Sequence, residues 1–321
     1  MTTVMRKYLD WALIISCNFM WATQVSVIKL IGDRLGPVAI TFLPMIFSTL
    51  IFLPALWLEA RRRGTGLHWR WADARHFLIA GICGTFLIQF TYTLGSQRTL
   101  AANAGIITLT IPVFVALAAS LMLGEKMNPV RVLSFVLALA GVLMTSTSDL
   151  RGAHFGGAQY LAGNLWFLVA CAASAFYNTY CKLLVDKKYT ELEILVYSSM
   201  VASVASLPLF VWLEPLHLST LAGLDRVAIW GLLELSLVVY GLSMLVFFAV
   251  LKRLDVTLAS LGNYLLPFFI ALLALAVLKE SITRLMIGGG AIVLASTLLV
   301  TVYETRILAW LARRPRILEW H

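Results

Sequence analysis

The stretch PVFVALAASLMLGEKMN (residues 112–128) has a counterpart 155 residues further along the chain, PFFIALLALAVLKESIT (residues 267–283). Seven of the 17 aligned positions are identical, and both copies hold a proline and a glutamate 13 residues apart. A weaker match at a shift of 153 residues pairs Lys29-Leu30 with Lys182-Leu183. Alanine and leucine matches are common between apolar helices, whereas a helix-interior proline followed by a terminal glutamate is not. The pattern predicts a chain made of two related halves.

Composition places both halves in a lipid bilayer. Of the 321 residues, 60% are hydrophobic and only 13% are charged, and the mean hydropathy is +0.88. Apolar runs of about 20 residues recur along the chain, and each can cross a ~30 Å hydrocarbon layer as a helix, the form that satisfies its own backbone hydrogen bonds. We predict ten transmembrane helices at 11–31, 37–58, 76–96, 99–123, 129–147, 161–184, 193–213, 226–251, 255–278 and 284–303.

Five spans is an odd number, so two like halves of five must insert with opposite orientations. The sequence therefore predicts an all-α integral membrane fold of two inverted five-helix repeats, over residues 1–150 and 158–305, with a basic cytoplasmic tail at 306–321. The Gly-rich polar stretch 148–160 joins the repeats. Inverted repeats recur among secondary transporters, whose substrate site lies near mid-membrane at the repeat interface. A small-molecule carrier is the functional class that this architecture favours, although symmetry alone does not establish it.

The net charge of +9 comes from basic residues in the links between spans, which indicates membrane topology rather than a nucleic-acid surface. With ten spans, the Lys and Arg residues divide 18 to 7 between the two sides, and the positive-inside rule places both termini and residues 59–75 in the cytoplasm. The basic N-terminus continues directly into the first span, so we expect a retained helix rather than a cleaved signal. The expected location is the inner (plasma) membrane, as a monomer or loose dimer.

Polar side chains deep inside spans are the candidates for substrate binding, because a buried polar group in lipid is costly unless it is paired. Aromatic members would add stacking or cation–π surface for an amino-acid-like ligand. Each polar residue alone fits hydrogen bonding between packed helices equally well, but as a set they converge from both repeats on one central cavity. The candidates are Asn18, Trp21, Gln24, Gln89, Tyr92, Asn103, Tyr177, Asn178, Glu234, Tyr240, Asn263 and Tyr264.

Glu234 is the sharpest single candidate, because it lies about 12 Å inside the eighth span at 1.5 Å per residue. An intramembrane carboxylate is a proton-site or cation-site hypothesis by default, and protons are a candidate second partner. The alternative is a structural role, with Glu234 paired with Lys29 or placed in a wet vestibule. Glu125 and Glu280 end helices and are interpreted as structural, pairing with or capping neighbouring turns. Pro112 and Pro267 interrupt the backbone hydrogen bonds of their helices and predict either hinges or fixed kinks.

No feature of the chain predicts a cofactor or a metal. The four cysteines (Cys17, Cys83, Cys171 and Cys181) lie within spans, without metal-ligand spacing, and are expected to pack as small apolar residues without disulfides. The five histidines are scattered over links and ends, and no glycine-rich phosphate loop is present. A polytopic membrane enzyme is thereby disfavoured, and so is a channel, because no ring of repeated charges is visible.

The sequence resembles the drug/metabolite transporter superfamily in its form with two EamA domains. The resemblance rests on NFMWATQVSVIKL (18–30), AANAGIITLTIPVFVALAASLMLGEKM (101–127) and TLASLGNYLLPFFIALLALAVLKESIT (257–283). In that family the fourth helix of each repeat carries a proline and then a leucine-glycine-glutamate end; this chain departs once, with Lys279 at the second glycine. The resemblance implies a carrier of small metabolites such as amino acids, often outward. Vitamin, nucleotide-sugar and drug substrates remain open alternatives.

Overall fold

The structure is a computed structural model that describes residues 3–64, 67, 70–123, 129–147, 157–214, 223–251, 265–280, 282–299, 303 and 306. Within those ranges the regular elements are all helices. Seven helical segments are long and apolar enough to span a membrane, and three shorter apolar helices follow at Pro129–Val142, Leu266–Leu278 and Arg284–Ser296. Each of these ten segments overlaps one of the ten predicted spans, and the first part of the ninth, residues 255–264, lies outside the described residues. The chain is an all-α membrane protein.

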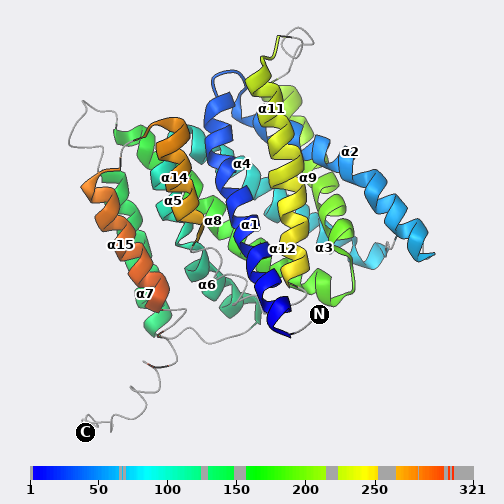
Figure 1. Cartoon of the computed structure of the whole chain (residues 1–321), viewed down its shortest axis with the longest axis horizontal. Coiled ribbons are helices and arrows are strands. Elements are labelled where there is room, and N and C mark those ends of the chain that lie inside the picture. The colour runs from blue at the N-terminus through cyan, green and yellow to red at the C-terminus, as the bar shows by residue number, and fades with distance from the viewer. Residues whose placement is uncertain are drawn as a thin grey trace.

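The helices follow one another in the order that the sequence predicted, with some spans divided (Figure 1). The first repeat comprises α1 (Thr3–Ile31), α2 (Pro37–Arg63), the third span as η1 (Trp71–Asp73), α3 (Ala74–Ile79), η2 (Ala80–Phe86) and α4 (Leu87–Arg98), the fourth as α5 (Ala101–Thr108) and α6 (Ile111–Leu123), and α7 (Pro129–Thr147). The second comprises α8 (Gly157–Asp186), α9 (Glu191–Leu213), the eighth span as α11 (Arg226–Glu234), η3 (Leu235–Leu242) and α12 (Ser243–Leu251), the ninth as α14 (Leu266–Leu273) and η5 (Ala274–Leu278), and α15 (Arg284–Leu298).

The two repeats are inverted with respect to each other. In Figure 1 the third span rises from α3 to α4, whereas its counterpart, the eighth span, descends from α11 to α12. The helix contacts repeat accordingly: α1 packs on the eighth span as α8 packs on the third, and α2 packs on the eighth span as α9 packs on the third. The pairs α2–α9 and α7–α15 join equivalent helices. This pattern is that of a pseudo-two-fold axis in the membrane plane.

Local sequence explains where several helices begin and end. Gly36 and Pro37 open α2, and Gly64 closes it in the left-handed conformation at φ 67°. Thr190 and Glu193 form a capping box at the start of α9. Lys279, the counterpart of Gly124 in the first repeat, ends η5 in the left-handed conformation at φ 57°.

Glycines allow the closest helix crossings. A Cβ on Gly95 of α4 would lie 2.8 Å from the backbone nitrogen of Phe167, and one on Gly163 of α8 would lie 2.4 Å from the carbonyl oxygen of Arg98. A Cβ on Gly141 would likewise meet the carbonyl oxygen of Gly289 at 2.8 Å, at the crossing of α7 and α15. Small residues at such crossings bring helix backbones together in lipid.

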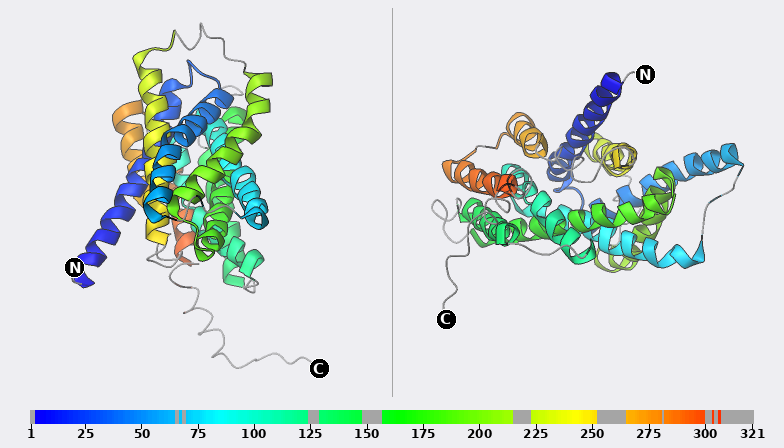
Figure 2. Two further views of the ribbon diagram at one scale, coloured as in Figure 1. Left: turned by 90° about the vertical axis from the view of Figure 1, so that its right-hand side faces the viewer. Right: turned by 90° about the horizontal axis from the view of Figure 1, so that it is seen from below.

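We name the two ends of the bundle by their links. The upper face carries residues 32–36, between α1 and α2, and the lower face carries residues 187–190, between α8 and α9 (Figures 1 and 2).

At the upper face Lys29 pairs with Glu280 (Nζ to Oε1, 3.4 Å) and donates to the Thr99 carbonyl oxygen at 2.6 Å. Glu280 also accepts from the backbone N–H of Ala102 at 3.2 Å, so its predicted pairing and capping role is confirmed. Glu125 lies outside the described residues.

Candidate functional site

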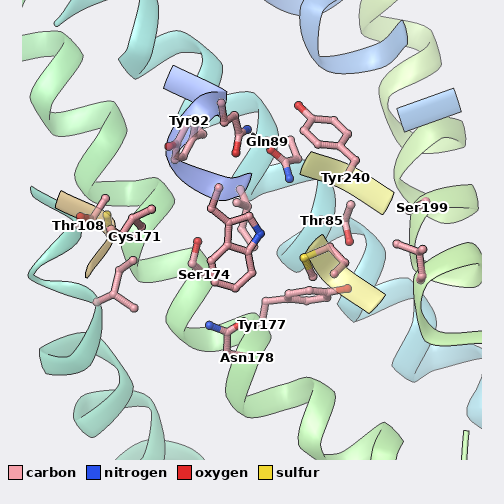
Figure 3. A pocket seen from close by; sticks show the side chains of 17 residues that line it. Thr85, Gln89, Tyr92, Thr108, Cys171, Ser174, Tyr177, Asn178, Ser199 and Tyr240 are labelled. Atoms are coloured by element: carbon pink, nitrogen blue, oxygen red, sulfur yellow. Dashed lines mark hydrogen bonds between the residues drawn. The ribbon is translucent and has the colours of Figure 1, made fainter. Parts of the chain in front are cut away.

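A cavity lies between the repeats near the middle of the bundle (Figure 3). Both repeats contribute to its wall, and aromatic rings alternate with hydroxyl and amide groups. The described residues that line it carry no charged side chain; they are Trp21, Gln24, Thr85, Ile88, Gln89, Tyr92, Thr108, Ile111, Cys171, Ser174, Tyr177, Asn178, Leu195, Ser199, Tyr240, Met244 and Leu266.

The first and third spans meet across the cavity through two amides. Gln24 Nε2 donates to Gln89 Oε1 at 2.6 Å, and Trp21 stands one helical turn before Gln24 in α1. Each glutamine has further donor and acceptor capacity for a ligand, because a primary amide offers two N–H groups and two carbonyl lone pairs. Tyr92 is fixed by its ring contact with Phe167, at 4.4 Å between centroids.

One face of α8 supplies the opposite wall, because residues three and four positions apart lie above one another on a helix. Cys171, Ser174 and Tyr177 follow this spacing, and Asn178 adjoins them (Figure 3). Tyr177 packs directly on Gly84, where an added Cβ would lie only 2.2 Å from Cδ2 of the ring. The bare backbone of Gly84 therefore makes room for the tyrosine.

The fourth span is broken where it reaches the cavity. The predicted single helix over 99–123 ends at Thr108 and restarts at Ile111, and both of these residues line the cavity. Pro112 has no N–H to donate to the carbonyl oxygen of Thr108, and Thr110 turns back by donating its backbone N–H to Ile107 at 2.9 Å. Pro112 thus stands next to a helix interruption rather than within a kinked helix.

Two π-helical segments occupy matching positions in the repeats, and sequence reasoning missed both. They are η2 (Ala80–Phe86) and η3 (Leu235–Leu242), and the 155-residue shift that aligns the repeats carries 80 to 235. Thr85 of η2 and Tyr240 of η3 are equivalent under that shift, and both line the cavity. The wider π turn rotates side chains onto a new face, and such turns often occur at functional sites.

Pro267 lies in the first turn of α14, beside the cavity residue Leu266. The candidates Asn263 and Tyr264 lie outside the described residues.

Glu234 and two of the asparagines lie away from the cavity lining. Asn18 is buried and donates to the carbonyl oxygen of Ile14 at 2.9 Å. Asn103 is completely buried, and in the part of the chain that the structure describes neither atom of its amide has a hydrogen-bond partner. Glu234 is half-buried against Thr23 rather than paired with Lys29. Thr23 Oγ1 contacts Glu234 Oε1, while Glu234 Oε2 is buried without a hydrogen-bond partner among the described residues.

Seven of the twelve candidates thus lie together around one cavity: Trp21, Gln24, Gln89, Tyr92, Tyr177, Asn178 and Tyr240. Sequence reasoning missed Ser199 and the apolar lining. It did not select Thr85, and it assigned Cys171 to packing. The signal that could have found Cys171 and Ser174 is their helical spacing before Tyr177. Among the described residues no cluster of His, Cys, Asp or Glu could hold a metal ion.

Comparison with known proteins gives a family for this architecture. The model of the EamA-like transporter family matches twice, over residues 11–147 and 161–302. The chain is 24% identical to a WAT1-related chloroplastic protein of Arabidopsis thaliana, over 92% of this chain and 70% of that protein. It is also 24% identical to a probable terminal-alkyne amino-acid exporter of Streptantibioticus cattleyicolor, over 90% and 92%, and 22% identical to an S-adenosylmethionine uptake transporter of Rickettsia felis, over 88% of each.

A crystal structure superimposes on 94% of this chain and 99% of its own, with a TM-score of 0.63 and 18% identity. At that identity the likeness concerns the fold alone.

Proposed function

Because the chain belongs to the EamA-like transporter family and is a small-metabolite transporter, we propose that it works by alternating access at the cavity between its two repeats. The observation that carries this proposal is the composition of the cavity wall. Equivalent spans of the two inverted repeats supply its polar and aromatic side chains. Inverted repeats can exchange conformations, so a site on their pseudo-axis faces first one side of the membrane and then the other.

The proposed substrate is a small metabolite without net charge, an amino acid or a related compound. The described lining offers amides, hydroxyls and aromatic faces but no cation or anion, and a ligand with net charge would lose its hydration without gaining a counter-ion. A zwitterion can divide its two charges between donors and acceptors such as those of Gln24, Gln89 and Asn178. Organic phosphates and nucleotide-sugars need cationic partners, which disfavours them. The probable amino-acid exporter among the relatives supports the same class. S-adenosylmethionine, which another relative takes up, shares the amino-acid group but carries a sulfonium cation in addition.

The test is counterflow into proteoliposomes that contain the purified protein. Neutral amino acids are expected to exchange, while phosphate esters of similar size are not. Gln89→Leu should slow exchange by about tenfold, because it removes the partner of Gln24 and a cavity donor. Ser48→Ala, at a buried position of α2 outside the lining, is the matched control and should exchange normally. Exchange of phosphate esters but not amino acids would refute the substrate class.

We propose that the upper face is extracytoplasmic, that both termini are cytoplasmic and that the membrane is the plasma membrane. The 18-to-7 division of basic residues supports this orientation, and export is the direction we expect. A cysteine replacing Leu67, which is exposed in the link after α2, should resist impermeant maleimide added to intact cells and react after permeabilisation. Labelling in intact cells would reverse the orientation.

Glu234 is proposed as a proton site that acts beside the cavity rather than within it. Thr23 has one hydroxyl proton and two oxygen neighbours, the carbonyl oxygen of Met20 at 2.7 Å and Glu234 Oε1. When Thr23 donates to Met20, the contact with Glu234 is a hydrogen bond only if the carboxyl group carries a proton. Thr23 adjoins Gln24, and Glu234 adjoins the π helix that carries Tyr240, so the proton can bias both cavity walls.

Glu234→Gln should abolish substrate accumulation driven by a pH gradient and leave exchange intact, because the amide keeps a donor for Thr23 but cannot release a proton. Glu59→Gln, a change in an exposed ion pair at the end of α2, is the matched control. Accumulation by Glu234→Gln with the pH dependence of the unmodified protein would make the carboxylate structural. No accumulation by the unmodified protein in a pH gradient would make the carrier a uniporter.

A further inference from the structure

Two ion pairs on opposite faces of the bundle are equivalent under the repeat. At the upper face Arg34 Nε donates to Asp225 Oδ2 at 2.8 Å. At the lower face Lys187 pairs with Asp73. A shift of 153 residues carries Arg34 to Lys187, the same shift that aligns Lys29-Leu30 with Lys182-Leu183, and a shift of 152 carries Asp73 to Asp225.

Each pair connects the link after the first helix of one repeat to the start of the third span of the other repeat. Arg34 and Lys187 lie in the link after the first helix of their own repeat, and Asp225 and Asp73 lie at the start of the third span of the other repeat. Both pairs therefore cross the repeat interface, at opposite ends of the same pseudo-axis. Of the remaining described ion pairs, Lys29–Glu280 also joins the two repeats at the upper face, but its counterpart under the repeat is not an ion pair among the described residues. Arg63–Glu59 and Lys182–Asp186 each lie within one helix.

We propose that these pairs are matched latches of the transport cycle: the upper face opens when Arg34 leaves Asp225, and the lower face opens when Lys187 leaves Asp73. The inference rests on alternating access as proposed above. Both latches are formed in this structure. All four side chains lie outside the cavity lining, so they position the repeats rather than bind substrate.

The two latches differ in strength. The side chains of Arg34 and Asp225 are 37% and 46% exposed, and pairs so open to water are weak. Lys187 is similarly open, at 41%, but Asp73 is only 4% exposed and also accepts from the Tyr189 hydroxyl at 3.0 Å. Burial and then the neighbouring Asp73 raise the pKa of Tyr189 to about 12, so the phenol keeps its proton at physiological pH. The Lys187–Asp73 latch is therefore the harder of the two to open.

The test measures which side of the membrane reaches the cavity. The reporter is Ser174→Cys, a cavity position, in a background with the four native cysteines replaced, labelled by impermeant maleimide from one side at a time. Asp225→Asn keeps an N-cap for α11 but removes the charge, and labelling from the upper face should rise by about two- to fivefold. Lys187→Met should raise labelling from the lower face on the order of tenfold, because it removes the charge partner of a buried carboxylate.

Asp186→Asn is the matched control, because it breaks the exposed pair within α8 at the same face as Lys187, and it should change neither ratio. The reverse-charge double variant of Lys187→Asp with Asp73→Lys should restore the closed ratio, which distinguishes a latch from a folding defect. Shifts toward the same side in both latch variants, or no shift in either, would overturn the inference. Failure of counterflow by the unmodified protein would instead refute the proposed function.

Discussion

Replacing Gly84 with alanine tests whether Tyr177 must lie where the structure places it. The new Cβ would lie 2.2 Å from Cδ2 of the tyrosine ring and 2.9 Å from Cε2. Carbon atoms in favourable contact are about 3.5–4.0 Å apart, so the ring edge must retreat by roughly 1.3 Å or more. Tyr177 is 3% exposed and packs in a core with Phe248 and Tyr197, so retreat into that core is obstructed.

The remaining free space beside Tyr177 is the cavity, so the ring should move into the substrate volume. Overpacking of this kind costs about 1–3 kcal/mol, and the helix propensity of alanine over glycine returns about 0.5–1 kcal/mol. We therefore expect the midpoint of thermal unfolding in detergent to fall by only a few degrees, while counterflow falls tenfold or more because a displacement of about 1 Å disrupts a binding geometry.

The matched control is Gly290→Ala, a helical glycine of α15 whose Cβ would meet Ile106 Cγ1 at an ordinary 3.4 Å. That variant should transport normally and be equally or more stable. Normal transport by Gly84→Ala at an unchanged midpoint would show that Tyr177 does not occupy this position, and the argument for the wall of α8 would fail with it.

Three further outcomes are expected. Lys279→Gly should raise the free energy of unfolding by about 0.5–1 kcal/mol, because glycine adopts the φ of 57° without strain, whereas Lys279→Ala should not. Glu280→Ala should lower it by about 1–2 kcal/mol, measured as thermal unfolding, because Ala102 loses its cap and Lys29 its partner. The Ala228 N–H and Arg34 hold the pKa of Asp225 below its usual 3.8. The upper latch is therefore lost only as the pH falls through that lowered value. Counterflow of Asp225→Asn and counterflow of the unmodified protein should vary in parallel between pH 5 and pH 8.

The number and order of the spans could be predicted because each depends on local sequence. Proline at 37, 129 and 267 stands at or next to a helix start, and Gly64 ends α2. The spans at 129–147 and 226–251 begin and end in the structure as predicted. The repeated glutamate predicted a helix end, and Glu280 does cap and pair at one.

The site could be predicted only in part, because the positions of polar residues along a helix do not show whether they face a cavity or a neighbouring helix. Asn103 and Gln89 are both deep polar residues, yet Gln89 faces the cavity and Asn103 is enclosed among helices. The π turns at η2 and η3 rotate the faces of the third and eighth spans, and no residue type in either segment marks a π turn. Tertiary packing decides their positions.

A last difference between the repeats concerns the two glutamates at equivalent positions, Glu59 and Glu214, 155 residues apart. Glu214 accepts from the backbone N–H groups of Val38 and Ala39 at 3.2 and 2.8 Å, so the end of α9 is tied to the start of α2 at the upper face. Glu59 instead pairs with Arg63 of its own helix, and α9 begins with its own capping box. The C-terminal end of α2 accordingly projects from the bundle (Figures 1 and 2). Among the described residues the tie between these helices exists on one face only, so separating α2 from α9 breaks polar contacts at their upper ends and none of this kind at their lower ends.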